Sequence, residues 1–148
     1  NIKEDQFDQK LIVRSAQVHS LMPMMQFSVA PWRILNKENL EIVKKSAELH
    51  KKFGPYILEY AKKSSQTGEP IIRHMEYEFP HQGFESIKDQ FMLGEKYLVA
   101  PIVTSEDNRK VVLPKGKWKD DLGKTYNGNL TIDINVPLSR IPYFEKIK

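Results

Sequence analysis

Residues 68–80, GEPIIRHMEYEFP, and residues 88–103, KDQFMLGEKYLVAPIV, decide the fold of this chain. From residue 71 to residue 79 the sequence alternates with the period of a strand. One predicted face carries Ile71, Arg73, Met75, Tyr77 and Phe79, and the other carries Ile72, His74, Glu76 and Glu78. Arg73 lies among apolar neighbours, so if buried it needs a partner, and we expect a carboxylate or a carbonyl. Residues 97–103 are apolar on both faces and predict a buried strand.

Short strand-like segments separated by turn residues continue to the C-terminus. Residues 111–113 and 141–144 are short apolar runs, and residues 130–136 alternate between apolar and polar side chains. Asn127-Gly128 is a strong hairpin signal. Strands of this length at close spacing predict an antiparallel β-sandwich over residues 67–148.

The first 66 residues have helical periodicity instead. We expect one helix from about residue 11 to residue 22, ended by Pro23, and a buried apolar loop over residues 24–35. Asn36 is a good N-cap for a second helix. Gly54-Pro55 predicts a stop and a restart, so a third helix is expected over residues 56–65. Helices followed by strands indicate an α+β fold.

The composition excludes several classes of protein. The 148 residues have a formal net charge of +4 and contain no cysteine. The lysines predict a solvated helix face rather than a nucleic-acid footprint, because no dense basic block is interleaved with aromatic residues. Without cysteine there is no disulfide and no thiolate metal site, although the cellular compartment stays open. No apolar run approaches the roughly 20 residues that a membrane span needs.

Five segments in order resemble glycoside hydrolase family 31, the retaining α-glycosidases. The segments are KLIVRSAQVHSLMPMMQFS (10–28), GPYILEYAKKSSQTGEPIIRHMEYEFP (54–80), DQFMLGEKYLVAPIV (89–103), VVLPKGKWKDDLGKTYNG (111–128) and VPLSRIPYFEK (136–146). They are similar to the family's Arg-Trp-x-Gln stretch, its Leu-Pro-Tyr helix and Arg-Pro-Leu strand, its Asp-Gln-Phe-x-x-Gly segment, its Leu-Pro-x-Gly-x-Trp strand and its Pro-Leu-x-x-Ile-Pro-x-Phe close. Each segment is a weak signal, but five in sequence are strong evidence.

The resemblance implies that this chain is the C-terminal portion of an α-glycosidase. Residues 1–66 would be the last loop and outer helices of the catalytic (β/α)₈ barrel, and residues 67–148 the proximal β-sandwich domain. A complete barrel takes about 250 residues. The nucleophilic Asp and the acid Asp, about 5–5.5 Å apart in retaining enzymes, would therefore lie in preceding sequence, and we expect this segment alone to be inactive. The resemblance implies a carbohydrate substrate, with the rest of the barrel as partner, and no cofactor.

The candidate substrate-binding residues are Gln26, Phe27, Ser28 and Trp32. They lie in a loop expected to reach the top of the barrel, where such enzymes place their sites. Amide and hydroxyl groups would hydrogen-bond a sugar, and Trp32 would stack on its ring. Gln26 and Ser28 stand where the resemblance places the family's Arg and His, so sugar recognition is expected to be altered. Ser15 also departs from the family, replacing its Trp. The alternative is that this loop is only a packed connection.

Other candidates have structural explanations that we favour. Glu76 and Glu78 are expected on a solvated strand face rather than as a catalytic pair. Asp89 is expected to make structural hydrogen bonds in the join between barrel and sandwich. The four histidines form no spaced metal set. As a rival function, a free-standing sandwich module would bind carbohydrate or protein without catalysis, through a stacking surface of Trp118, Tyr126 and Tyr143.

Overall fold

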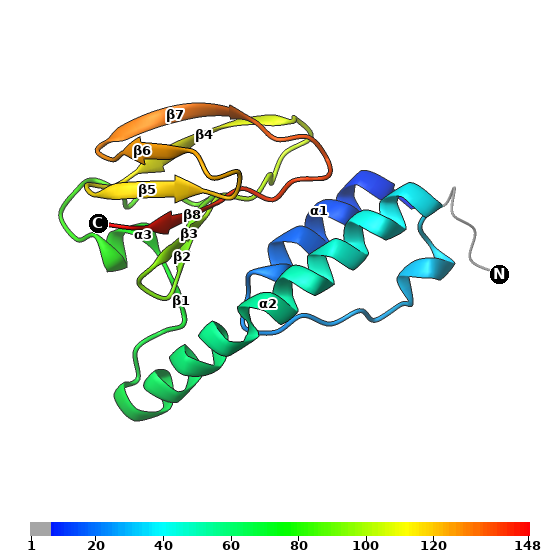
Figure 1. Ribbon diagram of the computed structural model, residues 1–148, viewed down its shortest axis with the longest axis horizontal. Helices are drawn as coiled ribbons and strands as arrows, with labels where there is room; N and C mark the ends of the chain where they lie inside the picture. The colour runs from blue at the N-terminus through cyan, green and yellow to red at the C-terminus, as the bar shows by residue number, and fades with distance from the viewer. Residues whose placement is uncertain (1–6) are drawn as a thin grey trace.

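The computed structural model describes residues 7–148, which form a helical layer followed by two antiparallel sheets (Figure 1). The helices are α1 (Gln9–Ser20), the short 3₁₀ helix η2 (Pro31–Arg33), α2 (Lys37–Thr67) and α3 (Met75–Glu78). The strands are β1 (Ile72–Arg73), β2 (Phe91–Leu93), β3 (Tyr97–Val99), β4 (Asn108–Leu113), β5 (Lys117–Asp120), β6 (Thr125–Asn127), β7 (Leu130–Asn135) and β8 (Tyr143–Lys146).

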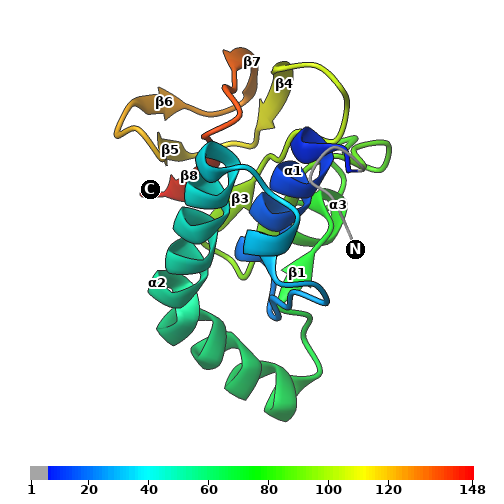
Figure 2. The ribbon, with the colours of Figure 1, turned by 90° about the vertical axis from the view of Figure 1, so that its right-hand side faces the viewer.

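The two long helices begin at side-chain caps. The Asp8 carboxylate accepts a hydrogen bond from the Leu11 amide at 3.0 Å, and the Asn36 side chain accepts one from the Asn39 amide at 2.8 Å. Each cap satisfies one of the amides that a helix start leaves unpaired. The two helices lie side by side and run in the same direction (Figures 1 and 2). A small apolar core, with Val13 and Val43 at its centre, holds them together.

The β half consists of two sheets with a core between them. The larger sheet has the strand order β1-β2-β3-β8-β5-β6, the smaller sheet pairs β4 with β7, and every pairing is antiparallel. Trp118 and Phe144 are fully buried between the sheets, together with Met92, Leu98, Val111 and Leu113. These sheets confirm the expected antiparallel arrangement.

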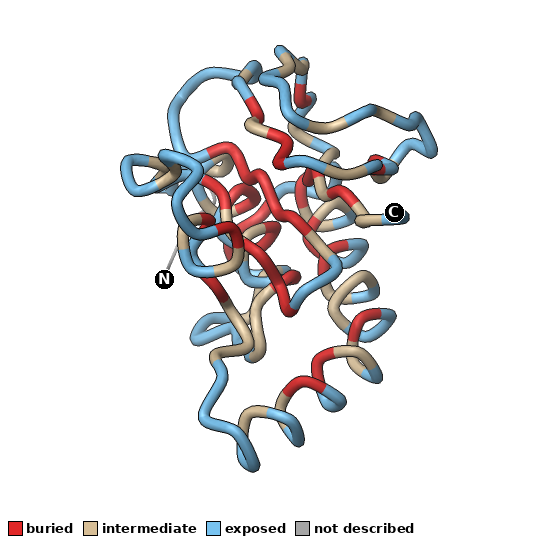
Figure 3. The backbone as a smooth tube through the Cα atoms, turned by 90° about the vertical axis from the view of Figure 1, so that its left-hand side faces the viewer, coloured by how far each residue is buried: buried red, intermediate tan, exposed pale blue. Residues whose placement is uncertain are grey.

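The long helix α2 packs on the outer face of the larger sheet. Phe53 and Ile57 from α2 meet Leu93 and Val99 from the sheet, and Leu21 joins them from the end of α1. Figure 3 shows the buried stretches gathered where these elements cross. Because apolar side chains from both halves share this cluster, the helical layer is part of the folded unit.

The prediction of a strand over residues 71–79 is mostly wrong. Only Ile72 and Arg73 pair with β2, and residues 75–78 form the helical turn α3. The His74 side chain caps that turn by accepting a hydrogen bond from the Glu76 amide at 3.2 Å. The period-two pattern therefore did not produce a strand, because the local cap ends the β ladder after Arg73.

The expected break at Gly54-Pro55 is also wrong, since α2 runs without interruption for 31 residues. A proline inside a helix removes one hydrogen bond. Here Phe53, before the proline, and Ile57, after it, are both buried against the sheet. Packing of that face therefore outweighs the local signal.

Asn127-Gly128 does not form a hairpin. β6 belongs to the larger sheet and β7 to the smaller one, so the chain changes sheets at this dipeptide. The Gly128 amide donates to the Gly116 carbonyl at 2.7 Å, and a Cβ at Gly128 would clash with the Pro114 carbonyl oxygen. The glycine is therefore required by a close backbone crossing.

Among residues 7–148, no helix combines the length and the hydropathy needed to cross a bilayer.

Candidate functional site

The extended segment between α1 and α2, residues 21–30, carries the predicted substrate-binding residues. It runs in the direction opposite to both helices (Figures 1 and 2). Among residues 7–148, no hydrogen bond involves the backbone or the side chains of residues 23–29. Its backbone donors and acceptors are therefore free to pair with another segment.

Gln26, Phe27 and Ser28 lie together along a hollow of about 460 Å³ against α1. All three side chains are exposed. Ser15 and His19, one helical turn apart on α1, line the same hollow. The His19 Nδ1 atom lies 2.8 Å from the Ser15 carbonyl oxygen.

Sequence reasoning missed Ser15 and His19 as lining residues. Their four-residue spacing puts them on one helix face. That spacing was a readable signal, but nothing in the sequence showed that this face meets residues 26–28.

Trp32 lies apart from Gln26 and Ser28. It lines a neighbouring hollow of about 350 Å³ with Phe27 and the start of α2, and its side chain is 71% exposed. The structure therefore divides the four predicted residues between two hollows that share Phe27. This surface offers an amide, a hydroxyl and two aromatic rings.

Among the described residues that line the first hollow, none is a carboxylate. The hollow therefore has hydrogen-bonding and stacking groups, but no acid and base pair for hydrolysis. Within the described part of the chain, no cluster of His, Asp and Glu side chains is placed to hold a metal ion.

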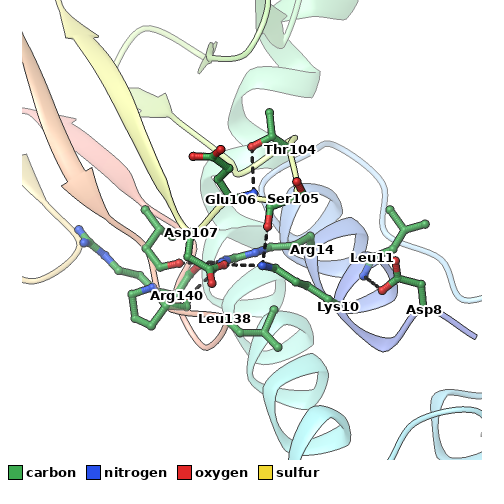
Figure 4. A network of polar contacts seen from close by, with 12 residues as sticks. Asp8, Lys10, Leu11, Arg14, Thr104, Ser105, Glu106, Asp107, Leu138 and Arg140 are labelled. Carbon is green, nitrogen blue, oxygen red and sulfur yellow. Dashed lines mark hydrogen bonds and ion pairs between the residues drawn. The ribbon is translucent and has the colours of Figure 1, made fainter.

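A buried arginine joins the helical layer to the β half (Figure 4). The Arg14 Nη2 donates to the Val136 carbonyl at 2.7 Å and to an Asp107 carboxylate oxygen at 3.0 Å, while Nη1 donates to the Arg140 carbonyl at 3.0 Å. The Lys10 ammonium lies 2.9 Å from the same Asp107 oxygen. The hydrogen bond from Lys10, followed by that from Arg14, lowers the pKa of the Asp107 carboxyl.

The expected partner of Arg73 is present at a second join. Its Nη1 atom lies 2.7 Å from the Glu78 carboxylate, and its Nε donates to the Pro70 carbonyl at 2.9 Å. Glu78 is therefore half-buried in an ion pair, not on a solvated face. Glu76 accepts hydrogen bonds from the His81 and Phe84 amides, and the His81 bond is the main cause of its lowered pKa.

Asp89 is also paired with an arginine. Its carboxylate is 3.1 Å from the Arg109 guanidinium, whose side chain is buried. This contact fits the structural role expected for Asp89.

The C-terminal domain model of glycosyl hydrolase family 31 matches residues 68–147. The chain belongs to this family. The match begins at Gly68, the left-handed C-cap of α2, and covers α3 and all the strands. The family 31 domain is therefore the β half of the molecule.

Curated family 31 relatives extend the similarity into the helices. Myogenesis-regulating glycosidase of Mus musculus is 34% identical over 142 residues, which cover 93% of this chain and 20% of that protein. An alpha-glucosidase of Saccharolobus solfataricus is 46% identical over 79 residues, which cover 53% of this chain and 11% of the enzyme. The chain thus spans about one fifth or less of these relatives' lengths.

Solved structures of family 31 share the fold. A dextranase of Flavobacterium johnsoniae, solved with glucose, has a TM-score of 0.85 at 33% identity over 93% of this chain and 18% of its own. An alpha-xylosidase from a soil metagenome, solved with xylose, has a TM-score of 0.83 at 29% identity over 94% of this chain and 25% of its own. The similarity covers both the helical layer and the sheets.

Proposed function

We propose that this family 31 chain is the C-terminal part of a retaining α-glycosidase. In this proposal residues 1–66 are the last elements of the catalytic barrel, and residues 67–148 are the proximal β domain. The observation that carries the proposal is the unpaired segment 23–29 between two parallel helices. Both halves and the family 31 match fit this assignment.

The arrangement of this segment is that of one repeat of a parallel α/β fold. In such folds each strand runs opposite to the helices that flank it and pairs with a strand on each side. Residues 21–30 have the flanking helices and the direction, but no paired strand within the described residues. A preceding barrel would supply both neighbours and would cover the apolar side chains on this face.

The catalytic Asp pair belongs in this proposal to the preceding part of the barrel. In this proposal a strand occupies the start of segment 21–30, and its carboxyl end leads into the residues that carry Gln26, Phe27, Ser28 and Trp32. Active sites of these barrels lie at the carboxyl ends of the strands. These side chains would therefore contact the sugar, with Gln26 and Ser28 setting a preference different from that of the family's Arg and His.

The rival interpretation as a free-standing binding module is weaker. Trp118 is fully buried, and the Tyr126 hydroxyl donates to Asp120 at 3.1 Å. Two of the three rings expected to form its stacking surface are therefore occupied inside the β half.

Hydrolysis of nitrophenyl α-glycosides tests the proposal. We expect turnover by the complete product of the reading frame and none by the 148-residue chain. In the complete enzyme, Gln26→Ala should raise KM for the preferred sugar, whereas Gln66→Ala, exposed near the end of α2, should leave KM unchanged. The proposal is overturned if the 148-residue chain itself turns over substrate and loses that activity when one of its carboxylates is replaced.

A further inference from the structure

A second groove lies away from the predicted site, with α2 on one side and, on the other, the turn after β5, the β7–β8 connection, β8 and β3. It consists of a cleft of about 520 Å³ and an adjoining pocket of about 160 Å³, and Tyr143 lines both. The α2 residues along it share one helix face: Ile42, Lys45, Ser46, Leu49, Lys52, Phe53 and Tyr56. At 1.5 Å per residue this stretch of helix is about 21 Å long.

The groove stays open in the proposed barrel. The side chains of α2 that line the Trp32 hollow are those of Leu40, Glu41, Val43, Lys44 and Ala47. At 3.6 residues per turn, this set points nearly opposite to residues 42, 45, 46 and 49. Protein that covers segment 23–29 and the Trp32 hollow would therefore leave the other face of α2 uncovered.

The groove combines aromatic surfaces with unused polar groups. The rings of Phe53, Tyr56, Tyr97 and Tyr143 line the smaller pocket. Within residues 7–148, the hydroxyls of Tyr97 and Tyr143 make no hydrogen bond. Phe53 is buried among these rings, but Tyr97 and Tyr143 are partly exposed and have unpaired hydroxyls. Such rings fit a ligand that has both apolar faces and hydroxyl groups, which is the chemistry of a sugar.

The charges of the groove favour a neutral ligand. Three cations, Lys45, Lys52 and Arg140, line the groove together with the carboxylates of Asp121 and Glu145, so the positive and negative charges nearly balance. The Arg140 guanidinium holds Asp121 in two hydrogen bonds of 2.7 and 2.9 Å, and Glu145 lies 2.7 Å from Lys96. Both carboxylates are therefore held in ion pairs with cationic side chains of the protein, so neither is free beside a bound ligand.

We propose that this groove binds an α-linked oligosaccharide without cleaving it. The proposal rests on the proposed function for the class of ligand, since the complete enzyme would act on the same sugars. Such a site would bind one part of a longer substrate while the catalytic barrel hydrolyses a bond in another part. Binding of the substrate in the groove raises its effective concentration at the catalytic site.

The test is a titration of the 148-residue chain with isomaltotriose and maltotriose, followed by amide chemical shifts. We expect saturable changes at residues that line the groove. The double variant Tyr97→Phe/Tyr143→Phe keeps both rings and should weaken binding about four- to hundredfold, since each hydroxyl supplies one hydrogen bond worth about two- to tenfold. Tyr77→Phe, on α3, is the matched control and should leave binding unchanged.

A second pair of variants addresses the groove without touching the aromatic rings. Lys45→Ala should weaken binding several-fold, whereas Lys44→Ala, on the Trp32 side of α2, should not. The proposal is overturned if neither sugar shifts groove residues, or if shifts occur only at residues 26–32. Absence of turnover by the unmodified complete enzyme would instead contradict the proposed function. The groove titration does not depend on that outcome.

Discussion

At the scale of single residues, the first position of the β2–β3 turn, Gly94, has no room for a side chain. Its φ angle is +59°, and a Cβ there would clash with the Tyr56 hydroxyl oxygen and lie 2.8 Å from the Tyr60 ring. The Tyr56 hydroxyl donates to the Leu93 carbonyl at 3.0 Å and accepts from the Lys96 amide at 3.2 Å. Gly94 therefore permits the close docking of α2 on this turn.

We predict that Gly94→Ala lowers the free energy of unfolding by about 3 kcal/mol, from left-handed strain and the clash together. Gly83→Ala is the control, because Gly83 has a φ of +78° but open space around its Cβ position. That variant should lose only about 1 kcal/mol. Urea denaturation of both variants measures the difference, and equal losses would show that the clash with α2 is unimportant.

Asp107 makes the join at Arg14 sensitive to acid. Its carboxyl has a pKa below the ordinary value of 3.8, because it accepts hydrogen bonds from Lys10 and Arg14. A carboxyl with a lowered folded pKa contributes stability that is fully present above its ordinary pKa. That stability is lost as the pH falls through the folded pKa.

We therefore predict that Asp107→Asn lowers stability at neutral pH and flattens its pH dependence below about pH 4. Asp133→Asn, on exposed β7, is the control and should change neither. Unfolding midpoints measured from pH 6 downward check this. An unchanged acid profile in Asp107→Asn would mean that the ion pair does not stabilise the fold.

At the scale of elements, α2 keeps two glycines in opposite situations. Gly54 lies inside the helix with nothing within 4 Å of its Cβ position, and Gly68 is the C-cap with φ of +77°. An interior glycine costs a helix backbone entropy, whereas a left-handed cap favours glycine.

We predict that Gly54→Ala raises the free energy of unfolding by about 0.5–1 kcal/mol. Gly68→Ala should lower it by about 1 kcal/mol. Thermal melts of the two variants should therefore move in opposite directions. A loss on Gly54→Ala would indicate that the helix needs flexibility at this point.

Elements set by neighbouring residues could be predicted from the sequence, and those set by distant contacts could not. The Asn36 cap and the alternation of residues 130–136 were readable because the signal is local. Gly54-Pro55 predicts a break that α2 does not have, because burial of α2 against β2 and β3 outweighs the local signal. The β-half partners of Arg14 lie more than 90 residues away in the chain, so no spacing pattern predicts them.

For the candidate site, the sequence indicated the residues but not how they are arranged. The four residues followed from a family pattern, and they lie on one connection between the helices. Their division between two hollows depends on which face of α1 meets residues 26–28, which is a tertiary contact. Ser15 and His19 line the first hollow because of the same tertiary contact.

At the scale of the whole molecule, apolar side chains are unevenly distributed. The barrel-side face, defined here by Leu11, Met24, Phe27, Val29 and Trp32, is exposed, with Met24 at 79% and Leu11 at 65%. Exposed apolar patches of this kind mark interaction surfaces. In the proposed parent enzyme this face would be covered by the preceding part of the barrel.

We predict that the 148-residue chain binds a hydrophobic dye and self-associates through the barrel-side face. The triple variant Leu11→Lys/Met24→Lys/Trp32→Lys should remove most of the dye binding and give a monomer, because charged side chains disfavour apolar association. Circular dichroism should stay close to that of the parent chain, since all three positions are exposed. The control Leu58→Lys/Leu122→Lys/Ile147→Lys changes three exposed apolar residues outside this face and should keep dye binding and association. Equal effects of the two triple variants would show that general surface hydrophobicity, rather than an uncovered barrel contact, drives association.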